Sequence, residues 1–246
     1  MTEHFSHVVR GSGPGLLLAH GAGGSVAANF GPILDDLART HTVVGRDYPV
    51  GGRPSLDGLA DALVTTAVSA GVERFAILGY SLGTAVAVRA ATRHPERVTG
   101  LLLTAGFAHP TNQMRLAVDV WRELLELGDK ELLAKYVTFA AVGGQFLNAL
   151  SPGELGDTLA GLVVPDGTAE LVDLVASVDT RPELGRITVP TLVIGTRQDV
   201  LVPIGVQREL ADGIRGAEYV EIASGHSMQA EARDEWLARI RDFLDR

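Results

Sequence analysis

A serine between two glycines is the first residue in this sequence whose surroundings indicate chemistry. Ser81 lies at the centre of Gly79-Tyr-Ser-Leu-Gly83, which fits the pattern Gly-x-Ser-x-Gly. The apolar run at residues 75–78 is too short for a helix and predicts a buried strand, whereas helical spacing begins at Leu82. A turn this tight strains the serine backbone and admits only very small residues two positions to either side. The pattern predicts a nucleophilic serine, with the backbone N–H of Leu82 at a helix N-terminus facing developing negative charge.

Ser81 needs a base, because a serine hydroxyl is a weak nucleophile at neutral pH. An imidazole, whose pKa is near neutral, is the usual base, and a carboxylate then holds its tautomer and stabilises its cation. Asp199 and His226 each lie just after an apolar run that predicts a strand, at residues 191–195 and 218–222. Alone, Asp199 would most often be a turn acid and His226 a surface histidine. Together with Ser81 they predict a catalytic triad of nucleophile, orienting carboxylate and base.

A second glycine-rich segment, His20-Gly-Ala-Gly-Gly24, follows a predicted buried strand over residues 16–19. Its glycines permit unusual backbone angles and close approach to a ligand, so the N–H groups of Ala22 and Gly23 could point into a site. By itself the segment would be a plain glycine turn. Beside the Gly-x-Ser-x-Gly pattern it predicts an anion-stabilising loop. His20 is expected to form hydrogen bonds that fix this loop, and not to act as a base.

The composition narrows the class of protein and its partners. Of the 246 residues 46% are hydrophobic and 21% charged, as in a globular protein. The net charge of −9, without any basic run, argues against nucleic acid or an anionic membrane as the main partner. The sequence has no cysteine, which excludes disulfides, a thiolate nucleophile and Cys-based metal sites. No apolar run approaches a membrane span, so we expect a cytoplasmic protein. We expect no cofactor or metal, and leave the oligomeric state open.

Apolar runs that predict strands alternate with helical patterns along most of the chain. The predicted strands lie at residues 5–9, 16–19, 42–47, 75–78, 98–104, 191–195 and 218–222. Continuous apolar strands that alternate with helices imply a parallel sheet covered by helices on both faces. The predicted fold class is therefore α/β, with a mainly parallel, doubly wound sheet whose carboxyl ends carry the chemistry.

This alternation stops over residues 107–182, where amphipathic segments follow one another without a strand-like run. The stretch predicts an all-helical insertion, which leaves residues 1–106 and 183–246 as the core. One helix carries Leu116, Val120, Leu124 and Leu127 on one face, and a capping box at Ser151-Pro-Gly-Glu154 predicts the start of another. Most apolar side chains here are expected to pack against each other or the sheet. The candidates for lining a substrate pocket are Met114, Trp121, Phe139 and Phe146, although packing in the core is the more common outcome for any one such residue.

These pieces together resemble the Ser-type α/β-hydrolase family over nearly the whole chain. The resemblance rests on the two glycine-rich segments, His94-Pro-Glu-Arg-Val, Pro190-Thr-Leu-Val-Ile-Gly with Asp199, and Gly225-His226. It implies a sheet of up to eight strands, a helical lid over the site, and an oxyanion hole formed by the N–H groups of Ala22 and Leu82. The chain departs from the family in that few residues precede Leu16, where two antiparallel strands are usual. The first strand is therefore expected to be absent or very short.

Serine at position 81 argues against haloalkane dehalogenase or epoxide hydrolase chemistry, which needs a carboxylate nucleophile. The resemblance leaves esters, thioesters, lactones, C–C bonds of β-diketones and cofactor-free perhydrolysis. The preferred interpretation is a serine hydrolase that cleaves a small carboxylic ester, thioester or lactone with an apolar moiety through an acyl-enzyme on Ser81. The alternatives are a C–C hydrolase with the same triad or a biosynthetic lyase or cyclase that uses His226 for proton transfer. A non-catalytic ligand receptor on this scaffold is a more remote one.

Overall fold

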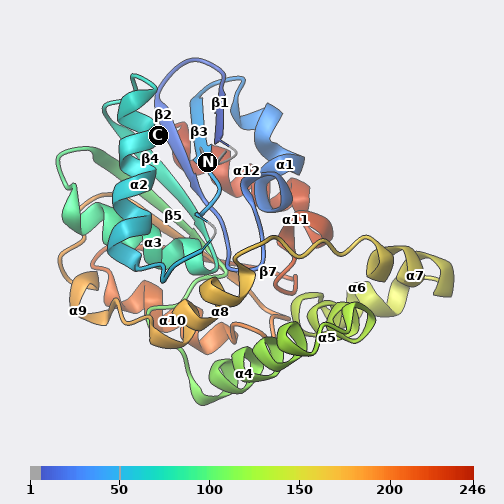
Figure 1. Cartoon of the computed structure of the whole chain (residues 1–246). Helices are drawn as coiled ribbons and strands as arrows, with labels where there is room; N and C mark the ends of the chain where they lie inside the picture. The colour runs from blue at the N-terminus through green and yellow to red at the C-terminus, as the bar shows by residue number, and fades with distance from the viewer. Residues whose placement is uncertain (1–6, 50) are drawn as a thin grey trace.

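A seven-stranded sheet runs through the part of the chain that the structure, a computed structural model, describes: residues 7–49 and 51–246 (Figure 1). Its strands are β1 (His7–Arg10), β2 (Gly15–Ala19), β3 (Thr42–Arg46), β4 (Phe75–Tyr80), β5 (Val98–Thr104), β6 (Thr191–Thr196) and β7 (Glu218–Ile222). The spatial order is β1-β3-β2-β4-β5-β6-β7. Only β1 pairs antiparallel, with β3, and the other neighbouring pairs are parallel. The predicted mainly parallel α/β sheet is confirmed.

The observed strands lie close to the predicted ones. Strands β5 and β7 have the predicted bounds, whereas β4 and β6 continue farther, to Tyr80 and Thr196. The first strand is short and begins at His7, while Phe5, where it was expected to begin, lies outside the described residues. Of the two antiparallel strands that are usual at this point in the family, the described residues contain one, β1.

Helices cover both faces of the sheet because successive strand residues point to opposite sides. In β2, Leu17 packs in one core cluster with α2 and α3, whereas Leu16 and Leu18 pack in a second cluster with α1 and α12. All three leucines are fully buried. The helices of the core are α1 (Val26–Leu37), α2 (Leu56–Ser69), α3 (Leu82–Arg93), α9 (Arg181–Leu184), α10 (Ile204–Gly213), α11 (Met228–Glu231) and α12 (Arg233–Leu244).

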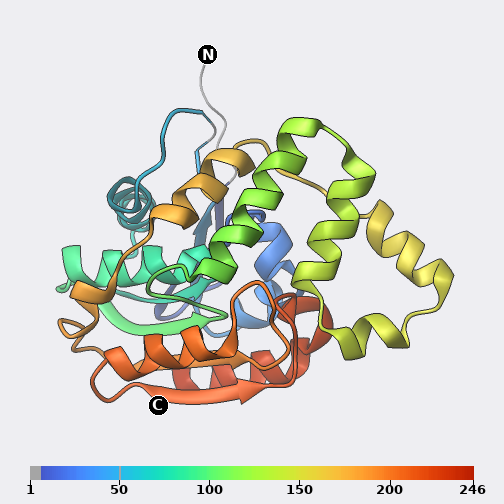
Figure 2. The ribbon, with the colours of Figure 1, turned by 90° about the horizontal axis from the view of Figure 1, so that it is seen from below.

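Between β5 and α9 the described chain forms only helices. They are α4 (Asn112–Leu127), α5 (Lys130–Ala141), α6 (Gly144–Ala149), α7 (Pro152–Ala160) and α8 (Thr168–Ser177). Figure 2 shows α4 crossing beside α8 and α5, while α6 and α7 lie farther from the sheet. The predicted capping box is present at the start of α7, where Ser151 and Glu154 each accept from the other's backbone N–H. This helical insertion follows the predicted all-helical pattern, and α6 was not anticipated.

Helix α4 carries two apolar stripes, and the one predicted from the sequence faces outward. Leu116 and Leu127 are both 66% exposed, whereas Met114 and Val118 are buried. The expectation that such leucines would pack against other elements is wrong for this face. Both stripes satisfy helical spacing, so periodicity identifies the helix without deciding which stripe meets the protein.

Candidate active site

The turn from β4 into α3 holds Ser81 in a strained backbone conformation. Its φ of 54° and ψ of −121° are rare for a residue with a side chain, and such strain persists only where the surrounding structure enforces it. Close contacts leave no room for a side chain at either flanking glycine. A Cβ at Gly83 would overlap the carbonyl oxygen of Ala19, and a Cβ at Gly79 would lie 2.6 Å from the carbonyl oxygen of Gly83. The expectation that only very small residues fit beside this serine matches these contacts.

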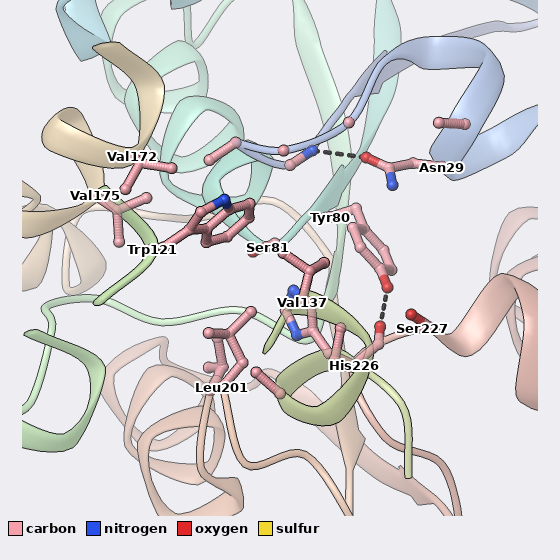
Figure 3. A pocket seen from close by; sticks show the side chains of 18 of the residues that line it. Asn29, Tyr80, Ser81, Trp121, Val137, Val172, Val175, Leu201, His226 and Ser227 are labelled. Carbon is pink, nitrogen blue, oxygen red and sulfur yellow. Dashed lines mark hydrogen bonds between the residues drawn. The ribbon is translucent and has the colours of Figure 1, made fainter. Parts of the chain in front are cut away.

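Asp199 and His226 come together at the carboxyl ends of β6 and β7. Nδ1 of His226 lies 2.7 Å from Oδ2 of Asp199, and both residues are buried. An imidazole bonded to a carboxylate at Nδ1 carries its proton there, which leaves Nε2 free to accept a proton. Ser81 and His226 both line one cavity, and Figure 3 shows their side chains there together.

Asp199 is itself held by four hydrogen bonds, so its carboxylate is pre-oriented toward His226. Oδ1 accepts from the backbone N–H groups of Leu201 and Val202, at 2.9 and 2.8 Å. Oδ2 accepts from the hydroxyl of Thr196 at 2.9 Å as well as facing the imidazole. These bonds fix the orientation of the carboxylate. The arrangement suits a carboxylate that holds the His226 imidazole in one tautomer and stabilises its cation.

His20 fixes the glycine-rich loop, as expected from the sequence. Its Nδ1 bonds to the carbonyl oxygen of Gly21 at 2.8 Å, and its Nε2 accepts from the backbone N–H of Tyr48 at 3.0 Å. The Tyr48 ring stacks on the imidazole at a centroid distance of 3.8 Å. Burial lowers the pKa of His20 to about 4, so the side chain is neutral at neutral pH. Both nitrogens are occupied by the backbone, which leaves neither for proton transfer.

The proposed oxyanion N–H groups belong to the two segments that meet beside Ser81. Ala22 lines the cavity, and Leu82 is the first residue of α3, where a backbone N–H has no partner within the helix. The glycine loop approaches the elbow closely, because a Cβ at Gly21 would lie 3.2 Å from the Cβ of Ser81. The oxyanion role of Ala22 and Leu82 remains a prediction.

The cavity beside Ser81 has a volume of about 380 Å³ and lies between the sheet and the helical insertion. Its apolar wall includes Met114, Val118 and Trp121 from α4. No Asp, Glu, Lys or Arg is among its lining residues in the described chain. Trp121 lies against the glycine loop, since a Cβ at Gly23 would be 2.5 Å from its Cζ2 atom.

Two of the predicted pocket aromatics are not in the wall of this cavity. Phe139 and Phe146 are absent from its lining, and Phe139 is 71% exposed. On α5 the residues that line the cavity are Tyr136, Val137, Ala140 and Ala141, whereas Phe139 is exposed to solvent. The prediction that Phe139 and Phe146 line the pocket is therefore wrong, because it rested on residue type and not on helix orientation.

Sequence reasoning missed the residues that support the predicted ones. Asn29 accepts from the N–H of Gly21 at 2.8 Å, and the Tyr80 hydroxyl donates to the carbonyl oxygen of His226. Burial raises the pKa of Tyr80, so this hydroxyl stays protonated and able to donate. Tyr80 was visible as the variable residue before Ser81, but nothing in its type or position indicated a partner so far along the chain.

Neither a metal site nor a membrane-spanning helix is found in residues 7–49 and 51–246. No group of three or more His, Asp or Glu side chains is placed there to hold a metal ion. In the same residues, no helix is both long and apolar enough to span a membrane.

A mainly parallel sheet with helices on both faces and a helical insertion after β5 is the architecture of an α/β hydrolase. The profile of the Alpha/beta hydrolase family matches residues 16–240, and the chain belongs to that family. Its relatives are named as hydrolases and esterases, and the protein is an enzyme that hydrolyses ester-like bonds.

Three relatives illustrate the similarity. The chain is 30% identical to the pyrrolizixenacetamide deacetylase of Xenorhabdus hominickii, over 97% of this chain and 94% of that one. It is 28% identical to the pimeloyl-[acyl-carrier protein] methyl ester esterase of a Shewanella species, over 96% and 92% of the two chains. The crystal structure of the enol-lactonase from Burkholderia xenovorans superposes with a TM-score of 0.86 at 22% identity, covering 98% of this chain and 96% of that one, and shares its fold.

Proposed function

We propose that this enzyme is a serine hydrolase that cleaves a small, uncharged carboxylic ester with an apolar moiety, thioesters and lactones included. The observation that carries the proposal is the 2.7 Å bond between His226 and Asp199, with His226 and Ser81 on the wall of one cavity. A buried imidazole held in this tautomer is what a serine hydroxyl requires as its base.

The reaction follows from the geometry in two halves. His226 takes the Ser81 proton at Nε2 as Oγ attacks the ester carbonyl carbon, and the N–H groups of Ala22 and Leu82 stabilise the resulting oxyanion. The C–O bond then breaks, His226 protonates the leaving alcohol, and the acyl group stays on Ser81. Water, deprotonated by His226, then attacks the acyl carbonyl carbon. The bond between this carbon and Ser81 Oγ breaks, His226 returns the proton to Oγ, and the carboxylic acid leaves.

The lining of the cavity supports an uncharged substrate. A carboxylate or ammonium group would lose its hydration there and find no Lys, Arg, Asp or Glu among the described lining residues. Apolar side chains from α4 and α8, such as Val118 and Val172, favour a hydrocarbon acyl or alcohol part. The partner is therefore a small molecule that enters without an ion pair.

An organophosphonate tests the nucleophile directly. We expect one adduct, located on Ser81 by peptide mass spectrometry, and loss of ester hydrolysis in step with labelling. Ser81→Ala should remain unlabelled and lose turnover by about 10³-fold or more. Labelling at another residue, or an active Ser81→Ala enzyme, would contradict the proposal. A pre-steady-state burst of p-nitrophenol would separate an acyl-enzyme from a lyase or cyclase that only transfers protons through His226.

A second candidate is removal of an acetyl group from an amide, because the relative at 30% identity is named as a deacetylase of an acetamide. The same triad serves both reactions, since His226 can protonate a leaving amine as well as an alcohol. Phenyl acetate and acetanilide share the acetyl group and differ only in the leaving atom. Appreciable turnover of acetanilide would favour the amidase, and turnover of phenyl acetate alone would favour the esterase.

A further inference from the structure

The cavity beside Ser81 has two walls of opposite character. One wall is mainly apolar and comes from the helical insertion, with Trp121, Val137, Val172 and Val175. Nε1 of Trp121 is a buried donor on this wall that has no partner among the described residues. Facing it across Ser81 is a wall of uncharged polar side chains from α1 and from the segment that follows His226, which we call the polar wall: Asn29, Ser227 and Gln229. Figure 3 shows Asn29 and Ser227 on one side of Ser81 and Trp121 and Val172 on the other.

Asn29 presents a hydrogen-bond donor that the protein does not use. The side chain is only 7% exposed, and its Oδ1 accepts from the backbone N–H of Gly21 at 2.8 Å. This bond identifies which end of the carboxamide is oxygen, so the other end is the NH2 group. That nitrogen has no acceptor among the described residues. The nitrogen is not one of the buried polar atoms that lack a partner, so it opens onto the cavity that Asn29 lines, where a ligand oxygen can accept its hydrogen bond in place of water.

Ser227 and Gln229 complete the wall with groups that are also unused. The Ser227 side chain precedes α11 but makes no capping hydrogen bond. Oε1 of Gln229 lies 3.0 Å from the Tyr80 hydroxyl, and the Gln229 amide nitrogen has no acceptor in the part of the chain described. The single proton of this hydroxyl is shared between Oε1 of Gln229 and the carbonyl oxygen of His226, so the polar wall and the catalytic histidine contact the same tyrosine.

We propose that the polar wall binds a second oxygen of the substrate, a carbonyl, ether or hydroxyl oxygen separate from the scissile ester; the inference rests on the proposed function. Amide and hydroxyl groups recognise a neutral acceptor by direct hydrogen bonds. The substrate is then two-ended, with its hydrocarbon part against the helical insertion and its accepting oxygen against α1 and α11. Analogues that lack this oxygen leave the wall's donors unpaired and are discriminated against.

Two pairs of esters test this assignment, each differing by one ether oxygen in place of a methylene. p-Nitrophenyl methoxyacetate and p-nitrophenyl butanoate probe an oxygen in the acyl part; 2-methoxyethyl acetate and butyl acetate probe one in the alcohol part. The measured quantity is the ratio of kcat/KM for the ether to kcat/KM for the methylene compound. Dividing the wild-type ratio by that of a variant cancels the intrinsic reactivity of each ester.

For at least one pair, the ether-to-methylene ratio of kcat/KM should be about threefold to tenfold lower in Ser227→Ala and in Gln229→Met than in wild type. This is the effect of losing one neutral hydrogen bond. Asn29 is left intact because it also positions Gly21. Val137→Ala, on the apolar wall, is the matched control and should leave the ratio within twofold of wild type while changing the rates on both esters. Thermal melts establish that each variant is folded.

The inference is overturned if the ratios of both pairs stay within twofold of wild type in folded Ser227→Ala and Gln229→Met. Calorimetric titration of the same esters into Ser81→Ala, with and without the polar-wall substitutions, measures the Kd of the ether and of the methylene compound. The ratio of these Kd values tests the polar wall even if no ester turns over. An active Ser81→Ala enzyme would instead overturn the proposed function, and the kinetic ratios would still decide the role of the polar wall.

Discussion

At the scale of single residues, the site depends on which hydrogen-bonding groups the backbone has already engaged. His20 and His226 are both buried histidines near glycine-rich turns. The backbone occupies both nitrogens of His20, whereas His226 bonds Asp199 through Nδ1 and retains Nε2. The sequence could separate the two roles because His20 begins a glycine loop and His226 follows the last strand. It could not reveal Asn29, whose role depends on a contact with Gly21.

Asp199→Asn is expected to lower kcat/KM by about 10³-fold to 10⁴-fold at neutral pH. Asparagine keeps an oxygen for the N–H groups of Leu201 and Val202, so its NH2 group faces His226. The imidazole must then accept at Nδ1 and carry its proton on Nε2, the tautomer that cannot take the Ser81 proton. Asp179→Asn is the control, since Asp179 pairs with Arg181 at the surface. Equal activity of the two variants would show that the carboxylate comes from elsewhere.

His20 predicts a specific pH dependence of stability. Its pKa is about 4 in the folded protein, against 6.5 for an ordinary histidine. Between these values the unfolded chain binds a proton that the folded one excludes, so the free energy of unfolding falls as the pH drops below about 6.5. The loss between pH 7 and pH 5 is on the order of 2 kcal/mol. Urea unfolding at pH 5 and pH 7 measures this loss in wild type and in His20→Gln, which should lose less. The pKa of His41 is also lowered, but His41 is present in both proteins, so only the difference between them reports on His20. An equal dependence of the unfolding free energy on pH in the two proteins would contradict the assignment.

At the scale of elements, the helical insertion is hydrogen-bonded, where α5 ends and α6 begins, to the loops that carry Asp199 and His226. Glu231 accepts from the N–H of Gly225 at 2.8 Å and from the N–H of Gly143 at 3.1 Å. The backbone N–H of Ser227 donates to the carbonyl oxygen of Ala141 at 2.8 Å. Gln198, next to Asp199, bonds to Gln145. A displacement of this junction is therefore transmitted to the loops that hold Asp199 and His226.

Gly225→Ala tests that connection. The new Cβ would overlap the backbone nitrogen of Gly143, so the junction and the His226 loop must move apart. We expect kcat/KM on a small acetate ester to fall about 10-fold to 100-fold, the cost of misplacing a catalytic group by about 1 Å. Gly144→Ala is the matched control, because a Cβ at Gly144 would lie within 4 Å of no atom beyond its chain neighbours and its own helix backbone. A Gly225→Ala enzyme as active as Gly144→Ala would show that the loops are positioned independently.

At the scale of the whole molecule, the sequence predicted the sheet better than the insertion. Strands such as β2 are buried and free of polar side chains over their whole length because both faces of the sheet are covered, so the pattern alone locates them. Ser81, Asp199 and His226 follow such strands, and the topology then gathers them at one edge. The insertion has amphipathic helices whose orientation depends on packing against distant elements. Residue type therefore could not separate Trp121, which lines the cavity, from Phe139, which does not.

We expect the helical insertion to select the substrate and the core to perform the reaction. Trp121→Ala should raise kcat/KM for an octanoate relative to an acetate ester by about 10-fold or more, because each added methylene that finds apolar contact is worth about 0.8 kcal/mol. Phe139→Ala, which removes a similar aromatic from a position 71% exposed and outside the cavity, should leave the profile unchanged. Assays with p-nitrophenyl esters of graded length, run with thermal melts, measure both.

A different result would show that the helical insertion takes part in the reaction. If folded Trp121→Ala kept the wild-type chain-length profile while its rate on acetate collapsed, Trp121 would act on the reacting groups through the glycine loop that it touches at Gly23. A changed profile in Phe139→Ala would mean that α5 rotates to bring that face to the substrate. Only the first pattern, a shifted profile for Trp121 and none for Phe139, fits a rigid insertion that forms one wall of the cavity while Ser81, Asp199 and His226 remain on the sheet.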